Sequence, residues 1–220
     1  MILVRQALAA LAVLRAGIGV RFWTALAYAR LRLHGASVGR GLRVHGPLRI
    51  RCHPTGEIRI GEGCRIQSGF AGNPVGGGSR MSLWVGKEGR LRLGDRVGLS
   101  NSTIVCMRSV VIEDDVYLGG GSRIYDTDFH SVRAQERGRP GNPGTRTAPV
   151  QLRRRAFVGG HSTLLKGVTV GEEAVVGAGS VVRTDVPDGQ IWAGNPAVFV
   201  RELSPRRARI AAGDALEAVR

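Results

Sequence analysis

The chain has 220 residues, of which 43% are hydrophobic, so it is long enough for one ordinary domain with a core and terminal additions. A formal net charge of +15 favours anionic partners, but no helix-turn-helix, zinc-finger or RNA-recognition motif is present, so we expect no nucleic acid among them. Aromatic residues reach only 5% while 33 residues are glycine, which predicts a core of aliphatic and small side chains.

Residues 1–37 are predicted to form an amphipathic helical segment. Its longest stretch without a charge runs from Gln6 to Leu14, which is short of the roughly 20 apolar residues that a membrane-spanning helix needs. We expect one helix, or two helices broken near Gly17 and Gly19. Two interpretations stay open, because the segment can cap the domain or lie on an anionic membrane surface.

The basic character of this region supports the second interpretation. Glu57 is the first acidic residue of the chain, so the arginines before it are unopposed in the sequence. These arginines are Arg5, Arg15, Arg21, Arg30, Arg32, Arg40, Arg43, Arg49 and Arg51.

Residues 38–200 are predicted to form a coil of short parallel strands, because aliphatic residues recur at every sixth position. A constant interval of six does not stay on one face of an α-helix, and regular hairpin signals are absent. With three units per turn, Val158 should stack on Val176 and Leu164 on Val182, about 4.8 Å apart. The first residues of the six-residue units are Val158, Leu164, Val170, Val176 and Val182, and the fifth residues, which are small or β-branched, are Ser162, Val168, Ala174, Ser180 and Val186.

The six-residue spacing of aliphatic residues continues upstream with less regularity. Two excursions, residues 67–82 and 126–152, interrupt it with Gly, Pro and Arg, and long loops of this kind are often functional. Residues 201–220 are predicted to form a basic helical tail. The upstream positions are Leu93, Leu99 and Val105, then, after a one-residue slip, Ile112, Leu118 and Ile124, with earlier traces at Val38, Val44 and Ile60.

The repeat of an aliphatic residue, glycine, two variable residues and a small residue resembles the hexapeptide-repeat acyltransferases, clearly over residues 83–201 and more weakly over 38–66. The resemblance implies an all-β left-handed parallel β-helix that assembles as a homotrimer. It also implies transfer of an acyl group from acyl-CoA, acetyl-CoA in the simplest case, to a hydroxyl group. The sequence DTDFHS around His130 resembles the corresponding sequences of maltose-type, galactoside-type and cell-surface-glycan O-acetyltransferases. The acceptors of these enzymes are saccharides, glycolipids or polysaccharide precursors.

His130 is the candidate catalytic residue. A hydroxyl is a poor nucleophile until its proton is removed, and a neutral imidazole near pH 7 can remove it. Asp126 and Asp128 can orient the imidazole or bind the acceptor, although both are also common turn residues. Asn101 matches the position of an acceptor-binding asparagine in the family, and it can equally be an asparagine at a corner of the coil.

The resemblance also implies residues that contact coenzyme A. Small residues let the pantetheine arm approach the backbone, although the repeat alone explains their presence. Arg201, with Arg206 or Arg207, can pair with the 3′-phosphate, and Asn195 belongs to the AGNPA turn near which the adenine end binds in the family. The complete set is Gly159, Gly160, Lys166, Ala178, Gly179, Asn195 and Arg201.

Two other functions are alternatives to acyl transfer. A γ-carbonic-anhydrase-like metal enzyme needs three zinc-binding histidines, but His34, His45, His53, His130 and His161 include no closely spaced pair, so we expect no metal. A non-catalytic β-helical scaffold at the membrane would bind no coenzyme A. Three widely spaced cysteines fit a reducing compartment, so we predict a cytoplasmic protein, with attachment to the inner face of the membrane as the open alternative.

Overall fold

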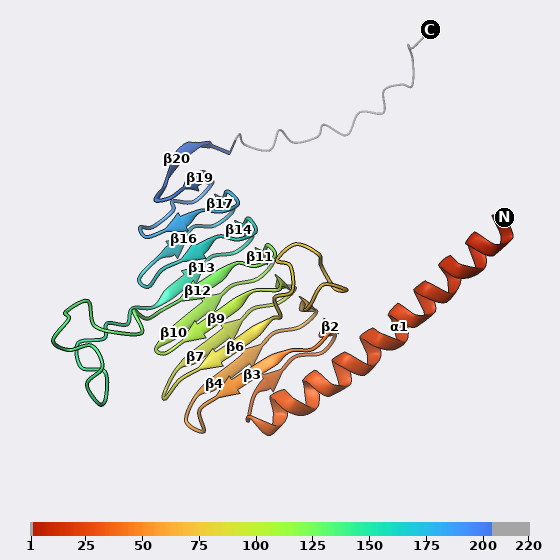
Figure 1. The fold of residues 1–220 in the computed structure, drawn as a ribbon. Helices are drawn as coiled ribbons and strands as arrows, with labels where there is room; N and C mark the ends of the chain where they lie inside the picture. Colours follow the sequence, from red (N-terminus) through yellow and green to blue (C-terminus); the bar gives the residue numbers. More distant parts are fainter. Residues whose placement is uncertain (1, 204–220) are drawn as a thin grey trace, which may run out of the picture.

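The computed structural model describes residues 2–203, and the side chains of residues 17–203. A single helix, α1 (Ile2–Leu33), precedes 20 strands that wind into a triangular column (Figure 1). Apart from the strands at the C-terminal end, each strand pairs in parallel with the strand three positions further along the chain, which builds three sheets. The column is therefore the parallel β-helix that the six-residue spacing predicts.

The three sheets form the sides of the column. Sheet A contains β1 (Ser37–Val38), β4 (Glu57–Ile60), β7 (Arg90–Leu93), β10 (Ser109–Ile112), β13 (Val150–Leu152) and β16 (Thr169–Val170). Sheet B contains β2 (Arg43–His45), β5 (Arg65–Gln67), β8 (Gly98–Ser100), β11 (Tyr117–Leu118), β14 (Phe157–Val158), β17 (Val175–Val176), β19 (Gln190–Gly194) and β20 (Ala197–Glu202). Sheet C contains β3 (Arg49–Cys52), β6 (Ser82–Val85), β9 (Thr103–Cys106), β12 (Arg123–Tyr125), β15 (Thr163–Leu164) and β18 (Val181–Val182).

Aliphatic ladders fill the interior of the column. Val158 is the register partner of Val176, and Leu164 is the partner of Val182, as the sequence predicts. Every predicted first and fifth position between Val158 and Val186 is buried, including Ser162 and Ser180. The hydroxyls of these two serines donate to the carbonyl of Gly177, at 2.9 and 2.6 Å, which satisfies a polar group inside an apolar core.

One predicted core position, Val105, is wrong. Ile104 is the residue in register with Ile124, and it is fully buried in the ladder of sheet C. Val105 pairs with Tyr125 and therefore lies on the opposite face of the strand, because side chains alternate along a strand. Ile104 follows Leu99 by five residues and precedes Ile112 by eight, so the six-residue spacing is broken on both sides of Ile104 rather than by one residue after Val105.

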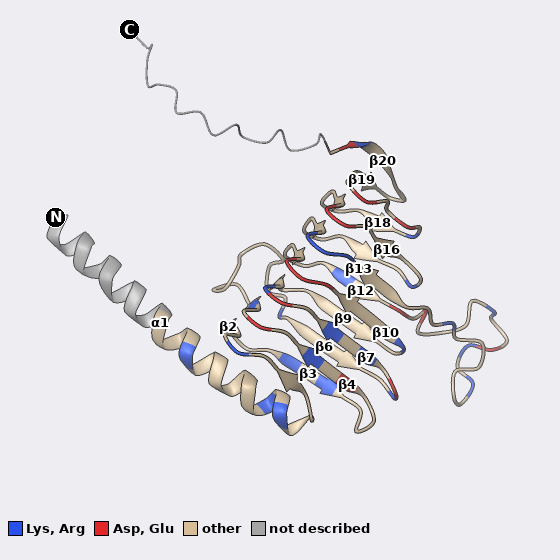
Figure 2. Ribbon diagram, turned by 180° about the vertical axis from the view of Figure 1, so that it is seen from behind, with Lys and Arg blue, Asp and Glu red and all other residues tan. Residues whose placement is uncertain are grey.

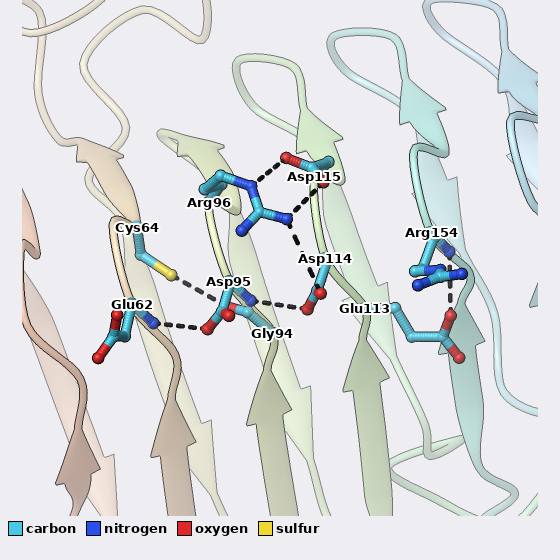
Figure 3. Close-up of polar contacts among 9 residues, drawn as sticks. All are labelled: Glu62, Cys64, Gly94, Asp95, Arg96, Glu113, Asp114, Asp115 and Arg154. Atoms are coloured by element: carbon cyan, nitrogen blue, oxygen red, sulfur yellow. Dashed lines mark hydrogen bonds and ion pairs between the residues drawn. The ribbon is translucent and has the colours of Figure 1, made fainter.

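The corner between sheets A and B is held by carboxylates that bond the main chain of the preceding coil (Figure 3). Asp95 accepts a hydrogen bond from the backbone N–H of Glu62 at 2.7 Å, and Asp114 accepts one from the N–H of Asp95 at 2.9 Å. Arg96 forms a bidentate pair with Asp115 at 2.7 Å, and both residues adopt a left-handed backbone conformation. The repeated corner keeps successive coils in register.

Helix α1 lies against the first coil of the column and contacts β2 and β1 (Figure 1). It is continuous through Gly17 and Gly19, which decides for one helix over a broken pair, because a single glycine costs a helix only about 1 kcal/mol. Ala27 and Leu31 are buried against the column, whereas Ile18, Phe22 and Leu33 are exposed. Within residues 2–203, no helix has the length and hydropathy needed to cross a membrane.

Two long loops leave the column at different corners (Figure 1). Residues 68–81 connect β5 with β6, at the corner between sheets B and C, and residues 126–149 connect β12 with β13, at the corner between sheets C and A. At the C-terminal end, Arg201 and Glu202 belong to β20, which pairs antiparallel with β19. This strand replaces the start of the predicted helical tail, whose remainder, with Arg206 and Arg207, lies outside the described residues.

Candidate active site

The loop that carries His130 has an ordered base. The N–H of Asp128 donates to the carbonyl of Arg146 at 3.0 Å, and the N–H of Ala148 donates to the carbonyl of Asp126 at 3.0 Å. Phe129 has a φ of 62° and packs edge-to-face on Tyr125, with ring centroids 5.2 Å apart. His130 directly follows this turn.

His130 lines a cleft of about 470 Å³ at the corner between sheets C and A. Its backbone N–H donates to the carbonyl of Asp128 at 2.7 Å, while its side chain is exposed. An exposed imidazole on the wall of a cleft can exchange protons with a bound hydroxyl. The other lining residues are Trp84, Met107, Thr127, Phe129, Gly141, Asn142, Thr145 and Thr147.

Asp126 is buried, and its carboxylate faces the column rather than His130. It accepts hydrogen bonds from the backbone N–H groups of Met107 at 2.7 Å, Arg108 at 2.7 Å and Ser109 at 2.9 Å. Burial raises the pKa of this carboxyl, while the three N–H groups oppose the shift by stabilising the carboxylate. Asp126 therefore fixes the turn between β9 and β10 beneath the cleft.

Asp128 and Lys166, which were predicted for different roles, form an ion pair. The ammonium nitrogen of Lys166 lies 2.6 Å from Oδ1 of Asp128, and the exposed fractions of the two side chains are 28% and 26%. Lys166 follows β15, one coil above the base of the loop. The pair fastens the first residues of the loop to the column next to His130.

Asn101 is buried and holds the other long loop, residues 68–81. Its Oδ1 accepts a hydrogen bond from the N–H of Gly69 at 2.7 Å, and its Nδ2 donates to the carbonyls of Asn73 at 2.7 Å and Val75 at 2.9 Å. Both amide hydrogens are engaged by the chain itself. Asn101 lies at the corner between sheets B and C, whereas His130 lies at the corner between sheets C and A.

Four of the predicted cofactor-binding residues lie together at the corner between sheets B and C. Gly159 is buried, and a side chain there would overlap the backbone of Ala178 on the next coil. The N–H of Gly179 donates to the carbonyl of Gly160 at 2.8 Å. Ala178 and Gly179 are exposed, so this corner offers a bare strip of backbone to a ligand.

Asn195 and Arg201 lie in the terminal hairpin of β19 and β20. Asn195 is exposed at the turn, where its peptide bond to Pro196 is cis. Arg201 is exposed on β20, and its guanidinium donates to the carbonyl of Glu202 at 3.2 Å. The structure thus places the predicted site residues in three groups: around the loop of His130, at the corner with Ala178, and on the terminal hairpin.

Trp84 and Met107 are cleft residues that sequence reasoning missed. Trp84 projects from β6, is 38% exposed, and has the Arg51 guanidinium 5.1 Å from its ring centroid. A tryptophan on an outward strand position was a usable signal in a chain with so few aromatic residues. Met107 follows β9 in an irregular turn and offered no comparable signal.

The residues of the cleft do not resemble a metal centre. Among the described residues, no three His, Cys, Asp or Glu side chains gather in a way that could hold a metal ion. Within residues 17–203, His130 is the one histidine that lines the cleft.

Comparison with known sequences finds the hexapeptide repeat. Residues 154–183 match the family model described as the hexapeptide repeat of succinyl-transferase. The galactoside O-acetyltransferase of Escherichia coli (strain K12) is 32% identical over 106 residues, which is 48% of this chain and 50% of that protein. The mitochondrial gamma carbonic anhydrase 2 of Arabidopsis thaliana is 53% identical over 51 residues, or 22% of this chain and 18% of that protein.

Among solved structures, the N-acyltransferase AntD from Bacillus cereus, in complex with dTDP and 3-hydroxybutyryl-CoA, has a TM-score of 0.62 and 19% sequence identity. The match covers 80% of this chain and 88% of that chain, and it shows the fold to be the left-handed parallel β-helix of the hexapeptide-repeat proteins. The chain spans half or less of the length of the curated relatives that it matches.

Proposed function

We propose that this protein is an acyl-CoA-dependent O-acyltransferase that moves an acetyl group from acetyl-CoA to a hydroxyl of a saccharide or a lipid-linked glycan. The observation that carries the proposal is the placement of His130, exposed on the wall of a cleft of about 470 Å³ at the root of a loop projecting from a hexapeptide coil. The sequence resemblance to a galactoside O-acetyltransferase supports the choice of reaction.

In the proposed reaction, the His130 imidazole removes the proton of the acceptor hydroxyl while its oxygen attacks the carbonyl carbon of the thioester. The new C–O bond forms, and the carbonyl electrons move to oxygen. When the tetrahedral intermediate collapses, the C–S bond breaks and the imidazolium returns its proton to the coenzyme A sulfur. No serine or cysteine nucleophile is required, because donor and acceptor react directly in a ternary complex.

Coenzyme A is proposed to lie along the corner of Gly159, Gly160, Ala178 and Gly179, towards Asn195 and Arg201. Within one chain, that corner lies where the strands of sheet C begin, whereas His130 lies beyond the corner where these strands end. We therefore propose a homotrimer, in which the loop of one copy meets the small-residue corner of the next copy. In this arrangement, Asp128 and Lys166 position the loop, while Asp126 and Asn101 act by holding the turns around the site.

The acceptor is proposed to be close to a membrane surface, and the protein to be cytoplasmic or attached to the inner face of the membrane. Exposed apolar side chains of α1 include Ile18, Phe22 and Leu33, and Arg21 and Arg32 are exposed on the same helix. A helix that exposes both apolar and basic side chains can bind an anionic lipid surface, because the apolar groups insert between the lipids and the arginines contact the headgroups.

Release of free coenzyme A thiol from acetyl-CoA tests the proposed reaction. Thiol release is expected to depend on a saccharide acceptor, and mass spectrometry of the product should show one added acetyl group. The panel should contain sugars with free hydroxyls and matched amino sugars, since these separate O-transfer from N-transfer. If calorimetry detects no coenzyme A binding and no acceptor stimulates thiol release, the column is a scaffold and not an enzyme.

A bulky residue at the small-residue corner is expected to weaken coenzyme A binding. Ala178→Trp should raise KM for acetyl-CoA on the order of tenfold or more with little change in kcat, because the indole would fill the path of the pantetheine arm. Ala178 is exposed, so the thermal midpoint should stay close to that of the wild type. Glu172→Trp, at the other corner of the same coil, is the control, and an equal rise in KM there would contradict the assignment.

A further inference from the structure

Sheet A carries a basic groove that the proposed reaction does not use. The groove has a volume of about 520 Å³ and lies on the outer face of β4, β7 and β10. Figure 2 shows Lys and Arg positions on neighbouring strands in this N-terminal half of the column. The lining residues are Arg59, Arg92, Leu93, Gly94, Val111, Ile112, Glu113, Asp114 and Arg154.

Two arginines are held side by side on this face. Arg59 and Arg92 are register partners on adjacent parallel strands, and both are exposed. Their Cα atoms are therefore about 4.8 Å apart, and the two side chains leave the sheet in the same direction. Like charges directly opposite each other destabilise a sheet unless a counter-charge lies between them.

The available carboxylates leave much of this charge uncompensated. Arg59 pairs through Nε with Glu57 on its own strand. Among the described residues, Arg92 and Arg154 have no carboxylate within ion-pair distance, although the flanking Arg153 and Arg155 pair with Asp188, Glu172 and Glu173.

The two acidic residues on the rim of the groove are already occupied. Glu113 accepts hydrogen bonds from the Gln151 side chain at 2.8 Å and from the backbone N–H of Arg154 at 3.0 Å (Figure 3). Asp114 accepts the N–H of Asp95 and lies 3.8 Å from Arg96. These carboxylates hold the corner, so no carboxylate in the described part of the chain occupies the guanidinium groups of Arg92 and Arg154.

We infer that this groove is a binding site for a diphosphate group, separate from the cleft of His130. Guanidinium groups bind phosphate oxygens in a bidentate manner, and the neighbouring Arg59 and Arg92 can engage linked phosphates at the same time. Arg154 closes the site from the corner, and Val111 gives the floor an apolar surface for the group attached to the phosphates. The ligand class is therefore a diphosphate ester, such as a carrier-linked or nucleotide-linked molecule.

Calorimetric titration of the full chain with inorganic pyrophosphate tests this site. The wild type should bind, with an affinity that falls as ionic strength rises. Arg92→Gln should weaken binding by roughly tenfold or more, because it removes a charge-assisted hydrogen bond. Arg154→Gln should weaken it in the same direction. Arg65→Gln is the matched control, because Arg65 is an exposed outward residue of β5 on sheet B, away from the groove.

Three results would overturn the inference. The first is unchanged pyrophosphate affinity in Arg92→Gln, or an equal loss in Arg65→Gln. The second is loss of pyrophosphate binding when coenzyme A is present at saturation, since the anion would then occupy a coenzyme A site. The third is binding to phosphatidylglycerol vesicles that depends on Arg92 without binding to pyrophosphate, which would make the groove a lipid contact. None of these readouts depends on acyl transfer, so the site can be tested even if the proposed enzyme function fails.

Discussion

Replacing His130 by alanine is expected to lower the rate of acyl transfer by roughly 10²–10⁴-fold, the range that a general base contributes. The loss should appear mainly in kcat, because the imidazole acts on the reacting proton rather than on binding of acetyl-CoA. The side chain is exposed, and it makes no hydrogen bond with any other described residue. The thermal midpoint of His130→Ala should therefore match that of the wild type within roughly 2 °C. Initial rates of thiol release and a thermal melt check both parts.

His34→Ala is the matched control for this experiment. His34 is also exposed, and it lies in the turn after α1, far along the chain from the cleft. This variant should keep the wild-type rate. Equal turnover by His130→Ala and the wild type would remove His130 from the mechanism.

Asp126→Ala is expected to destabilise the protein strongly. The substitution leaves the backbone N–H groups of Met107, Arg108 and Ser109, in a partly buried turn, without the buried carboxylate that accepts from them. An unsatisfied buried donor costs about 1–3 kcal/mol, so a total of about 3 kcal/mol is a modest expectation for the three together. In a chain of this size, the thermal midpoint should fall by roughly 6–12 °C, as measured by calorimetry or circular dichroism.

Asp128→Ala provides the comparison, since it removes a partly exposed ion pair with Lys166 from the same loop. Such a pair contributes only about 1 kcal/mol or less, so the midpoint should change little. If Asp126→Ala melts like the wild type but loses activity, Asp126 acts on the chemistry and its assignment to the turn is wrong.

The column could be predicted because its signal is periodic and local. Each aliphatic position from Val158 to Val182 belongs to one of the three ladders inside the triangle, and positions eighteen residues apart stack in the same ladder. Ile104 was missed because it is adjacent to Val105, and both are aliphatic and buried. Only the pairing of Ile104 with Ile124 decides which of the two points inward.

The site was less predictable, because residue type does not reveal where a polar side chain points. Asp126 and Asn101 have the chemistry of acceptor-binding residues, yet their polar atoms are used by the backbone of nearby turns. The contact between Asp128 and Lys166 joins two coils and depends on the path of the loop between them. Trp84 comes from a strand far upstream, and only the winding of the column brings it to the cleft.

Helix α1 and the terminal hairpin of β19 and β20 affect whether copies of this protein can associate end to end. A bare β-helix end would expose strand edges onto which another chain could add by the same winding. At one end, three α1 side chains take up such edge groups: the Thr24 hydroxyl accepts the N–H of Val44, and Tyr28 and Arg30 donate to the carbonyls of Gly39 and Leu48. At the other end, β20 reverses direction against β19. Because the two ends differ and neither continues the parallel pattern, end-to-end polymerisation is disfavoured, and association through the sides of the column is left as the open route.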